Sequence, residues 1–263
     1  IAIRRGPMKV PTTGTSVFAP VALNSPGSTP NTLLRTTNFP VDFYLDAVRN
    51  NGSVAKFGVG SRLQGRDAYL FTDYAGAESQ FGDLIDNLWD NNTGLAITDT
   101  NGSWNGNSTS QTTILEGFRR APSFMDVVCY TGTGANRTVT HNLTVVPEMM
   151  IVKCRSAETN WGIYTAQTGA NSVIPFTTQG AAVNSTVWNN TAPTSSVFTV
   201  GTAGTTNTSG ATYVAYLFAS CPGVSRVGSY TGTGATQVIN CGFTAGARFV
   251  LIKATSTTGN WLV

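Results

Sequence analysis

The chain has 263 residues, of which 11% are charged, whereas about 25% is usual in globular domains. Its hydrophobic content of 41% supports a packed core, so the low charge does not indicate disorder. The formal net charge is only +3, and no basic stripe of the kind that binds nucleic acid is present. No apolar run approaches the ~20 residues of a membrane helix. We therefore expect neither nucleic-acid binding nor membrane insertion.

The first seven residues end in Ile3-Arg4-Arg5-Gly6-Pro7, which is interpreted as the end of an apolar strand followed by a proline. A similar pattern, a strand end followed by a proline, occurs at Phe118–Pro122 and at Phe218–Pro222. Proline has no N–H to donate, so it stops a strand ladder. We therefore predict that residues 1–7 are the end of a preceding unit. We also expect the chain to be an excerpt from a longer polypeptide.

The first unit, residues 8–120, is predicted to be a divergent β-sandwich. Asn50–Ser53 is a tight-turn signal between two strand candidates. Apolar residues at helical spacing between Glu78 and Asp90 are compatible with a short helix. Two landmarks relate this unit to the next one: Pro40–Leu45 is placed opposite Pro147–Val152, and Leu88–Thr93 opposite Val187–Thr191.

A six-residue stretch, Tyr130–Ala135, returns unchanged as Tyr230–Ala235, and the two copies lie 100 positions apart. Other identical pairs share this offset: Phe118 and Phe218, Pro122 and Pro222, Lys153 and Lys253, Asn160 and Asn260, Trp161 and Trp261. Composition alone does not place so many pairs at one offset. The sequence therefore contains a duplicated unit of domain size.

The second unit, residues 121–220, alternates short apolar runs with Gly, Asn, Ser and Thr at intervals of about ten residues. This pattern predicts an all-β fold, namely tandem antiparallel β-sandwich (jelly-roll-like) repeats of about 100 residues. The third unit, residues 221–263, is predicted to be the start of a further repeat, truncated at its end. The Tyr-Thr-Gly-Thr-Gly stretch is interpreted as a hairpin turn whose glycines take positive φ.

Candidate catalytic and metal-binding residues are few. His141 could pair with Ser123 and Asp126 as in a hydrolase, but its counterpart in the third unit is Cys241, which favours a packing role. No Asp or Glu occurs from Thr159 to the end of the chain, which argues against the paired carboxylates of a glycosidase. We therefore predict no catalytic, cofactor-binding or metal site, and not an enzyme.

The four cysteines lack C-x-x-C spacing and do not recur with the repeat, so we predict free thiols in a protein made in a reducing cytoplasm. Lys153 and Lys253 are interpreted as residues that end core strands and reach toward water. Trp161 and Trp261 are interpreted as packing residues, with sugar stacking as the alternative.

Three stretches of the second unit together resemble tandem domains of tailed-bacteriophage virion proteins, usually labelled tail fibre or tail proteins. They are Asp126–Gly134, His141–Leu143 and Pro147–Lys153. The matching continues through Trp188–Thr191 and Tyr213–Phe218, and thus covers most of the chain after Phe118. The first unit departs from the pattern because it lacks the Tyr-Thr-Gly-Thr-Gly turn.

The resemblance implies a structural or adhesive protein of the virion, on the tail or capsid exterior, made in the host cytoplasm. Its implied partners are other virion proteins, copies of itself as in a homotrimer, and a host surface glycan or protein. A tail fibre or adhesin is the main hypothesis. The alternatives are a capsid decoration or architectural tail protein, and a carbohydrate-binding module. The module would need exposed aromatics, for which the candidate residues are Trp104, Trp188 and Tyr164.

Overall fold

The computed structural model describes residues 8–24, 31–48, 58–65, 68–80, 89–99 and 112–263. The predicted end of a preceding unit at residues 1–7, the turn at Asn50–Ser53 and most of the helix candidate lie outside this part of the chain. The all-β prediction is confirmed, since 36% of the described residues are in strands and 5% in helices, and the sheets are antiparallel. Sheets therefore define the fold, and the short helices are connections.

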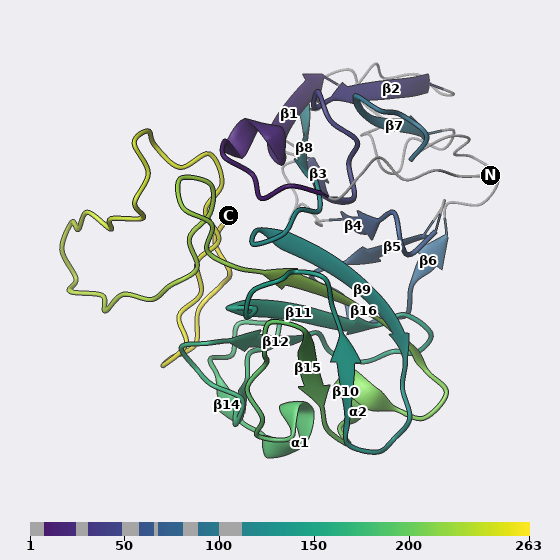
Figure 1. Cartoon of the computed structure of the whole chain (residues 1–263), viewed down its shortest axis with the longest axis vertical. Coiled ribbons are helices and arrows are strands. Elements are labelled where there is room, and N and C mark those ends of the chain that lie inside the picture. Colours follow the sequence, from purple (N-terminus) through teal and green to yellow (C-terminus); the bar gives the residue numbers. More distant parts are fainter. Residues whose placement is uncertain (1–7, 25–30, 49–57, 66–67, 81–88, 100–111) are drawn as a thin grey trace.

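The first unit consists of two sheets packed on each other (Figure 1). The larger sheet has the order β1-β8-β3-β4-β5-β6. Its strands are β1 (Phe18–Asn24), β3 (Phe43–Val48), β4 (Gly58–Ser61), β5 (Ala68–Phe71), β6 (Ser79–Gln80) and β8 (Thr112–Phe118). The smaller sheet pairs β2 (Asn31–Thr36) with β7 (Gly94–Asp99), and a 3-10 turn, η1 (Gly14–Ser16), precedes β1.

The second unit repeats this arrangement. Its larger sheet has the order β12-β11-β16-β9, and its smaller sheet pairs β10 with β15. The strands are β9 (Met125–Thr131), β10 (Arg137–Thr140), β11 (Met149–Cys154), β12 (Gly162–Thr165), β13 (Ser172–Val173), β14 (Ala182–Val183), β15 (Val197–Val200) and β16 (Thr212–Phe218). The two short helices are α1 (Ser185–Trp188) and α2 (Gly204–Asn207). A bridge between Ile163 and Ile174 adds the β13–β14 pair to the edge of the sheet. The larger sheets of the two units therefore share the same strand order, with β1-β8-β3-β4 corresponding to β9-β16-β11-β12.

The register shows that the sequence-based alignment of the first unit is wrong by one residue. Phe43 lies opposite Phe118, and Met149 lies opposite Phe218, so Phe43 corresponds to Met149 and not to Met150. A shift of one residue moves every side chain to the other face of the sheet. Tyr44 accordingly lies in the inner core of its unit, as Met150 does.

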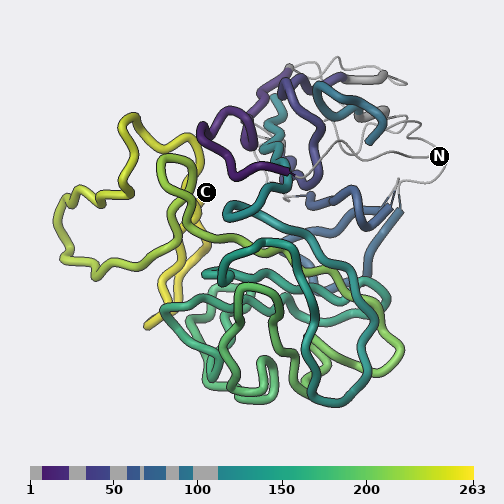
Figure 2. Tube along the Cα trace, in the orientation of Figure 1, coloured from purple at the N-terminus to yellow at the C-terminus, as the bar shows by residue number. Residues whose placement is uncertain are grey.

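The third unit keeps the local pairing of the second. An isolated bridge joins Cys221 to Ser225, as one joins Ala121 to Met125. Another joins Ile252 to Leu262, which corresponds to the pair Val152–Gly162 of β11 and β12. Figure 2 shows this last part of the chain, in yellow, lying beside both other units. The third unit forms no regular strand, but it keeps these two pairings of the second unit.

The tyrosine–glycine stretch at 130–135 is not a hairpin turn as predicted. β9 pairs with β16, whereas β10 pairs with β15, so the stretch carries the chain from one sheet to the other. Gly134 does take a positive φ, of 75°. This conformation is open to glycine because it has no Cβ.

Each complete unit has an inner core between its two sheets. In the second unit this core includes Trp188, Phe198 and Tyr213, all fully buried. The opposite face of the same sheet carries Ile151, Ile163 and Tyr216, which are also buried. Strands buried on both faces read as continuous apolar runs, which explains the unbroken apolar stretches of β11 and β16.

A central core joins all three units. It contains Phe43 and Phe118 of the first unit and Tyr216 of the second, and Phe249 of the third packs against it. The Phe249 ring centroid lies 5.8 Å from that of Phe18 and 5.8 Å from that of Phe118, so the first and third units touch directly. The units thus pack around one shared core.

Candidate functional site

Two of the three aromatic residues predicted to contact a ligand, Trp188 and Tyr164, are buried and not exposed at the surface. Trp188 is fully buried, and its indole nitrogen donates to the Ser172 carbonyl at 3.0 Å. Tyr164 is also buried and packs edge-on against Trp188 in the inner core of the second unit. Trp104 lies outside the described residues. This prediction is therefore wrong for two of the three residues, because they fill the space between the sheets.

His141 has a structural environment. Its Nδ1 accepts from the Leu143 amide at 3.2 Å, so the proton sits on Nε2, which donates to the Thr194 carbonyl at 3.1 Å. Burial lowers the pKa of His141. The Asp126 carboxylate accepts from Arg120 and from the Asn142 amide instead. Both ring nitrogens are thus hydrogen-bonded to main-chain atoms, in agreement with the predicted packing role.

The recurring lysine and tryptophan join the second unit to the first. Lys153 Nζ donates to the Ala75 carbonyl at 3.1 Å, and the Thr159 amide donates to the same oxygen at 2.9 Å. The Trp161 indole nitrogen donates to the Phe71 carbonyl at 3.0 Å. Together these contacts hold the loop after β5, and we call them the joint contacts.

The same contacts return one repeat later. Lys253 Nζ and the Gly259 amide both donate to the Thr178 carbonyl, at 3.1 and 2.7 Å. The Trp261 indole nitrogen donates to the Pro175 carbonyl at 3.1 Å. The third unit therefore holds the second as the second holds the first. The predicted packing role of both tryptophans is confirmed.

A further pair of bonds completes each joint. The Glu78 amide donates to the Arg155 carbonyl at 2.7 Å, and the Ala181 amide donates to the Thr255 carbonyl at 2.8 Å. Only the first joint adds an ion pair, in which Arg155 binds the Glu78 carboxylate through two nitrogens at 2.7 and 2.8 Å. Such two-point pairing fixes geometry as well as charge.

Lys153 does not reach water, so the prediction of a solvent-directed lysine is wrong at this position. The side chain is fully buried, and Nζ donates to the carbonyls of Ala75 and Cys154, the latter at 2.9 Å. The neighbouring unit covers the strand end, which sequence reasoning had taken for a surface. Burial lowers the pKa of Lys153 from 10.5 to about 8.

This shift predicts a pH dependence of stability. Between pH 8 and 10.5 the unfolded chain binds more protons at Lys153 than the folded protein does. The folded state therefore gains stability from this group as the pH rises through that window, by about 3 kcal/mol in total. Replacing the lysine with methionine removes the effect.

The measurement is the difference in unfolding free energy between the wild type and Lys153→Met, followed across the same pH range. We expect the difference to move in favour of the wild type as the pH rises. Taking the difference cancels the cysteines and tyrosines that titrate in both proteins. A difference that stays constant with pH would contradict burial of the charged amine.

The repeated stretch 130–135 is held by a buried asparagine that sequence reasoning missed. Asn207 Oδ1 accepts from the Thr133 amide at 2.8 Å, and Asn207 Nδ2 donates to the carbonyls of Ala135 and Gly201, both at 2.7 Å. Nothing in the sequence marks Asn207, because its counterpart would fall beyond residue 263.

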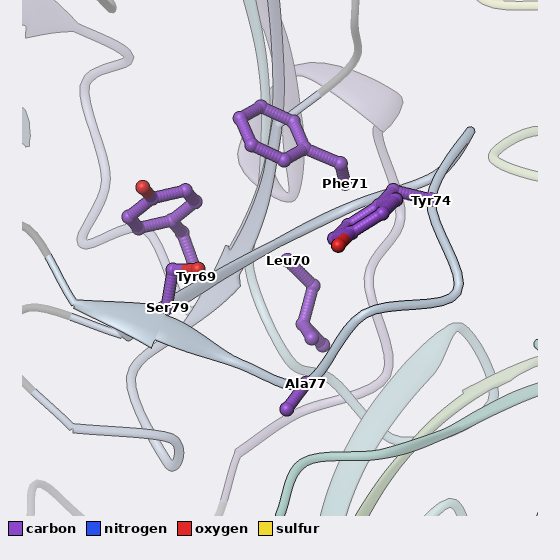
Figure 3. A pocket seen from close by; sticks show the side chains of 6 residues that line it. All are labelled: Tyr69, Leu70, Phe71, Tyr74, Ala77 and Ser79. Atoms are coloured by element: carbon purple, nitrogen blue, oxygen red, sulfur yellow. The ribbon is translucent and has the colours of Figure 1, made fainter. Parts of the chain in front are cut away.

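An aromatic pocket lies on the first unit (Figure 3). One of its lining residues, Phe71, also provides the carbonyl that accepts from Trp161 in the joint contacts. It has a volume of about 110 Å³. Its lining comes from β5, β6 and the loop between them: Tyr69, Leu70, Phe71, Tyr74, Ala77 and Ser79. The rings of Tyr69 and Phe71 meet edge to face, with centroids 5.3 Å apart. Sequence reasoning missed this pocket, although two aromatics spaced two apart on a strand share one face.

Tyr74 is the most exposed of these rings, with 56% of its surface accessible. A Cβ at Gly76 would lie 1.9 Å from a ring carbon of Tyr74, so only glycine allows the ring to rest on the loop backbone. The carbonyl between them, that of Ala75, is the one held by Lys153. The second unit thus fixes the loop that carries Tyr74.

Comparison with protein families gives one match. Residues 72–263 match a family described as Domain of unknown function (DUF7483). The chain belongs to the DUF7483 family. A search of curated proteins found no match, and no solved structure matches the chain. The DUF7483 range begins within the large sheet of the first unit and runs through both other units. It includes Tyr74, Ala77 and Ser79 of the pocket, whereas Tyr69, Leu70 and Phe71 lie before it.

The described residues of the DUF7483 chain bear on metal binding, on membrane-spanning helices and on disulfides. Among those residues, no three His, Cys, Asp or Glu side chains are grouped to hold a metal ion. The described residues also include no helix long and apolar enough to cross a membrane. All four cysteines are free, as predicted.

The inner core of the first unit differs in polarity from that of the second. Arg35 and Asp46 form an ion pair at 3.4 Å with side chains almost wholly buried. By the register, Asp46 corresponds to Val152, so an apolar residue occupies this place in the second unit. Burial raises the pKa of Asp46 to about 6. This exchange accounts for part of the divergence of the first unit.

Proposed function

We propose that the protein is a structural part of a tailed-bacteriophage virion, a tail fibre or adhesin whose tandem β-domains contact the host surface. The proposal includes no catalytic step and no cofactor. Its partners are other virion proteins, further copies of the chain, and a glycan or protein of the host surface. It rests on the sequence resemblance together with one structural observation.

That observation is the recurrence of the joint contacts. Lys153 and Lys253 each use their amine to fix a loop of the preceding unit, and Trp161 and Trp261 do the same with their indole nitrogens. Hydrogen bonds to main-chain atoms, added to a shared apolar core, leave adjacent units little freedom to move. A stiff assembly of domains suits a part that must keep its shape outside a particle.

Cryo-electron microscopy of particles of the phage that encodes the chain tests this proposal. We expect density for the units at the tail, with the pocket side of the first unit facing solvent. Density on the capsid lattice would support a decoration protein instead. Density enclosed within the tail shaft would support an architectural role. Absence of the chain from purified particles would overturn the virion assignment altogether.

A further inference from the structure

We propose that the pocket formed by Tyr69, Phe71 and Tyr74 binds a neutral hexopyranose unit of a surface glycan. This inference rests on the proposed function, because it names the kind of host molecule that the adhesin would contact. It assigns the contact to residues that sequence reasoning did not select.

The pocket has the composition that a sugar ring requires. The C–H face of a pyranose stacks on aromatic rings, and its hydroxyl groups need hydrogen-bonding partners at the rim. The lining supplies three aromatic rings, and Tyr69, Tyr74 and Ser79 also contribute hydroxyl groups. None of the described residues that line the pocket is charged, and this lining favours a neutral sugar over a phosphate or a sialic acid.

The size of the pocket sets how much of a glycan it can hold. Its volume of about 110 Å³ is well below the roughly 300–1,000 Å³ of pockets that enclose drug-sized ligands. The pocket therefore accepts one ring, and the rest of a chain would extend into solvent. Affinity for a single sugar is then low, and several copies of the protein would raise it by multivalency.

The loop under Tyr74 is rigid before any ligand arrives. Its Ala75 carbonyl accepts two hydrogen bonds from the second unit, and the neighbouring Glu78 is held by Arg155. Gly76 lets the Tyr74 ring lie against the backbone. A site ordered in advance loses less entropy on binding.

The second unit serves as an internal comparison. Val59 pairs with Leu70 where Ile163 bridges Ile174, so Leu70 corresponds to Ile174 and Tyr69 corresponds to Val173. The joint contacts match Phe71 with Pro175 and Ala75 with Thr178, which places Thr177 at the position of Tyr74. The joint thus forms without these aromatics.

The comparison also supplies the test variants, Tyr69→Val and Tyr74→Thr, because these residues stand at the same positions of the second unit. Saturation-transfer NMR would be recorded on the full chain with the methyl glycosides of glucose, galactose, mannose and N-acetylglucosamine. We expect transfer to the ring protons of at least one glycoside, weakened about tenfold or more in the double variant. Tyr230→Thr, at an exposed tyrosine of the third unit, should leave transfer unchanged.

Three results would overturn the assignment. The first is no saturation transfer to any of the four glycosides, and the second is equal saturation transfer in the double variant. The third is binding to phosphatidylcholine vesicles through these tyrosines without saturation transfer to any glycoside. Thermal unfolding of each variant checks that the fold is intact, which we expect because Tyr74 is largely exposed. The virion proposal fails separately. If the protein gives saturation transfer to a glycoside but is missing from particles, only the virion role is overturned. If density is found at the tail but no saturation transfer is seen, only the sugar-binding assignment of the pocket is overturned.

Discussion

Replacing Phe118 with alanine is expected to lower the free energy of unfolding by about 4 kcal/mol. The ring lies at the centre of the core shared by the three units. Its centroid is 5.2 Å from that of Phe43 in its own unit, 6.1 Å from Phe218 in the second and 5.8 Å from Phe249 in the third. The cavity left by alanine would therefore remove contacts from every unit at once.

Chemical denaturation measures the size of the loss, and hydrogen exchange shows where it falls. We expect protection to decrease in the large sheets of both the first and the second unit, because their outer faces meet in this core. Val238→Ala is the control, since that side chain is 95% exposed and its truncation should cost no more than about 0.5 kcal/mol. Exchange that increases in the first unit alone would mean that the units unfold independently.

The repeat made the fold class predictable from the sequence, and the details that failed share a physical cause. Strand spacing and turn residues are local signals, so the strands of the second unit could be predicted from its sequence. The free thiols could be predicted because the cysteines have no C-x-x-C spacing and do not recur with the repeat. The burial of Lys153 could not, because it depends on a loop of another unit that lies 78 positions earlier in the chain. The burial of Trp188 likewise follows from the way two sheets close over it.

The candidate site shows the same division. Phe71 and Tyr74 lie in a unit whose sequence has diverged, so the repeat gave no reason to single them out. Their counterparts in the second unit could be assigned only from the strand register. The alignment given by the register differs by one residue from the alignment that places Pro40 opposite Pro147. Register depends on pairing with β8 and β16, and pairing between distant strands leaves little trace in a single sequence.

The largest contrast between identical residues is expected at two glycines of the repeated stretch, Gly132 and Gly232. A Cβ at Gly132 would lie 2.2 Å from the Thr208 carbonyl oxygen, whereas a Cβ at Gly232 would meet nothing within 4 Å. Gly132 is also held on both sides, since its amide donates to the Ala211 carbonyl and its own carbonyl accepts from the Gly210 amide. The backbone there cannot move aside without breaking these bonds.

Gly132→Ala should therefore cost about 3 kcal/mol of unfolding free energy, and Gly232→Ala no more than about 0.5 kcal/mol. A second pair controls for the backbone conformation. Gly134 and Gly234 both have φ of 75°, so alanine at either position should cost a similar amount, about 1 kcal/mol. Denaturant unfolding of the four variants separates the two effects. If Gly232→Ala proved as damaging as Gly132→Ala, the turn of the third unit would have to pack against a backbone neighbour as the turn of the second unit packs against Thr208. The open surroundings described here for the third unit would then be wrong.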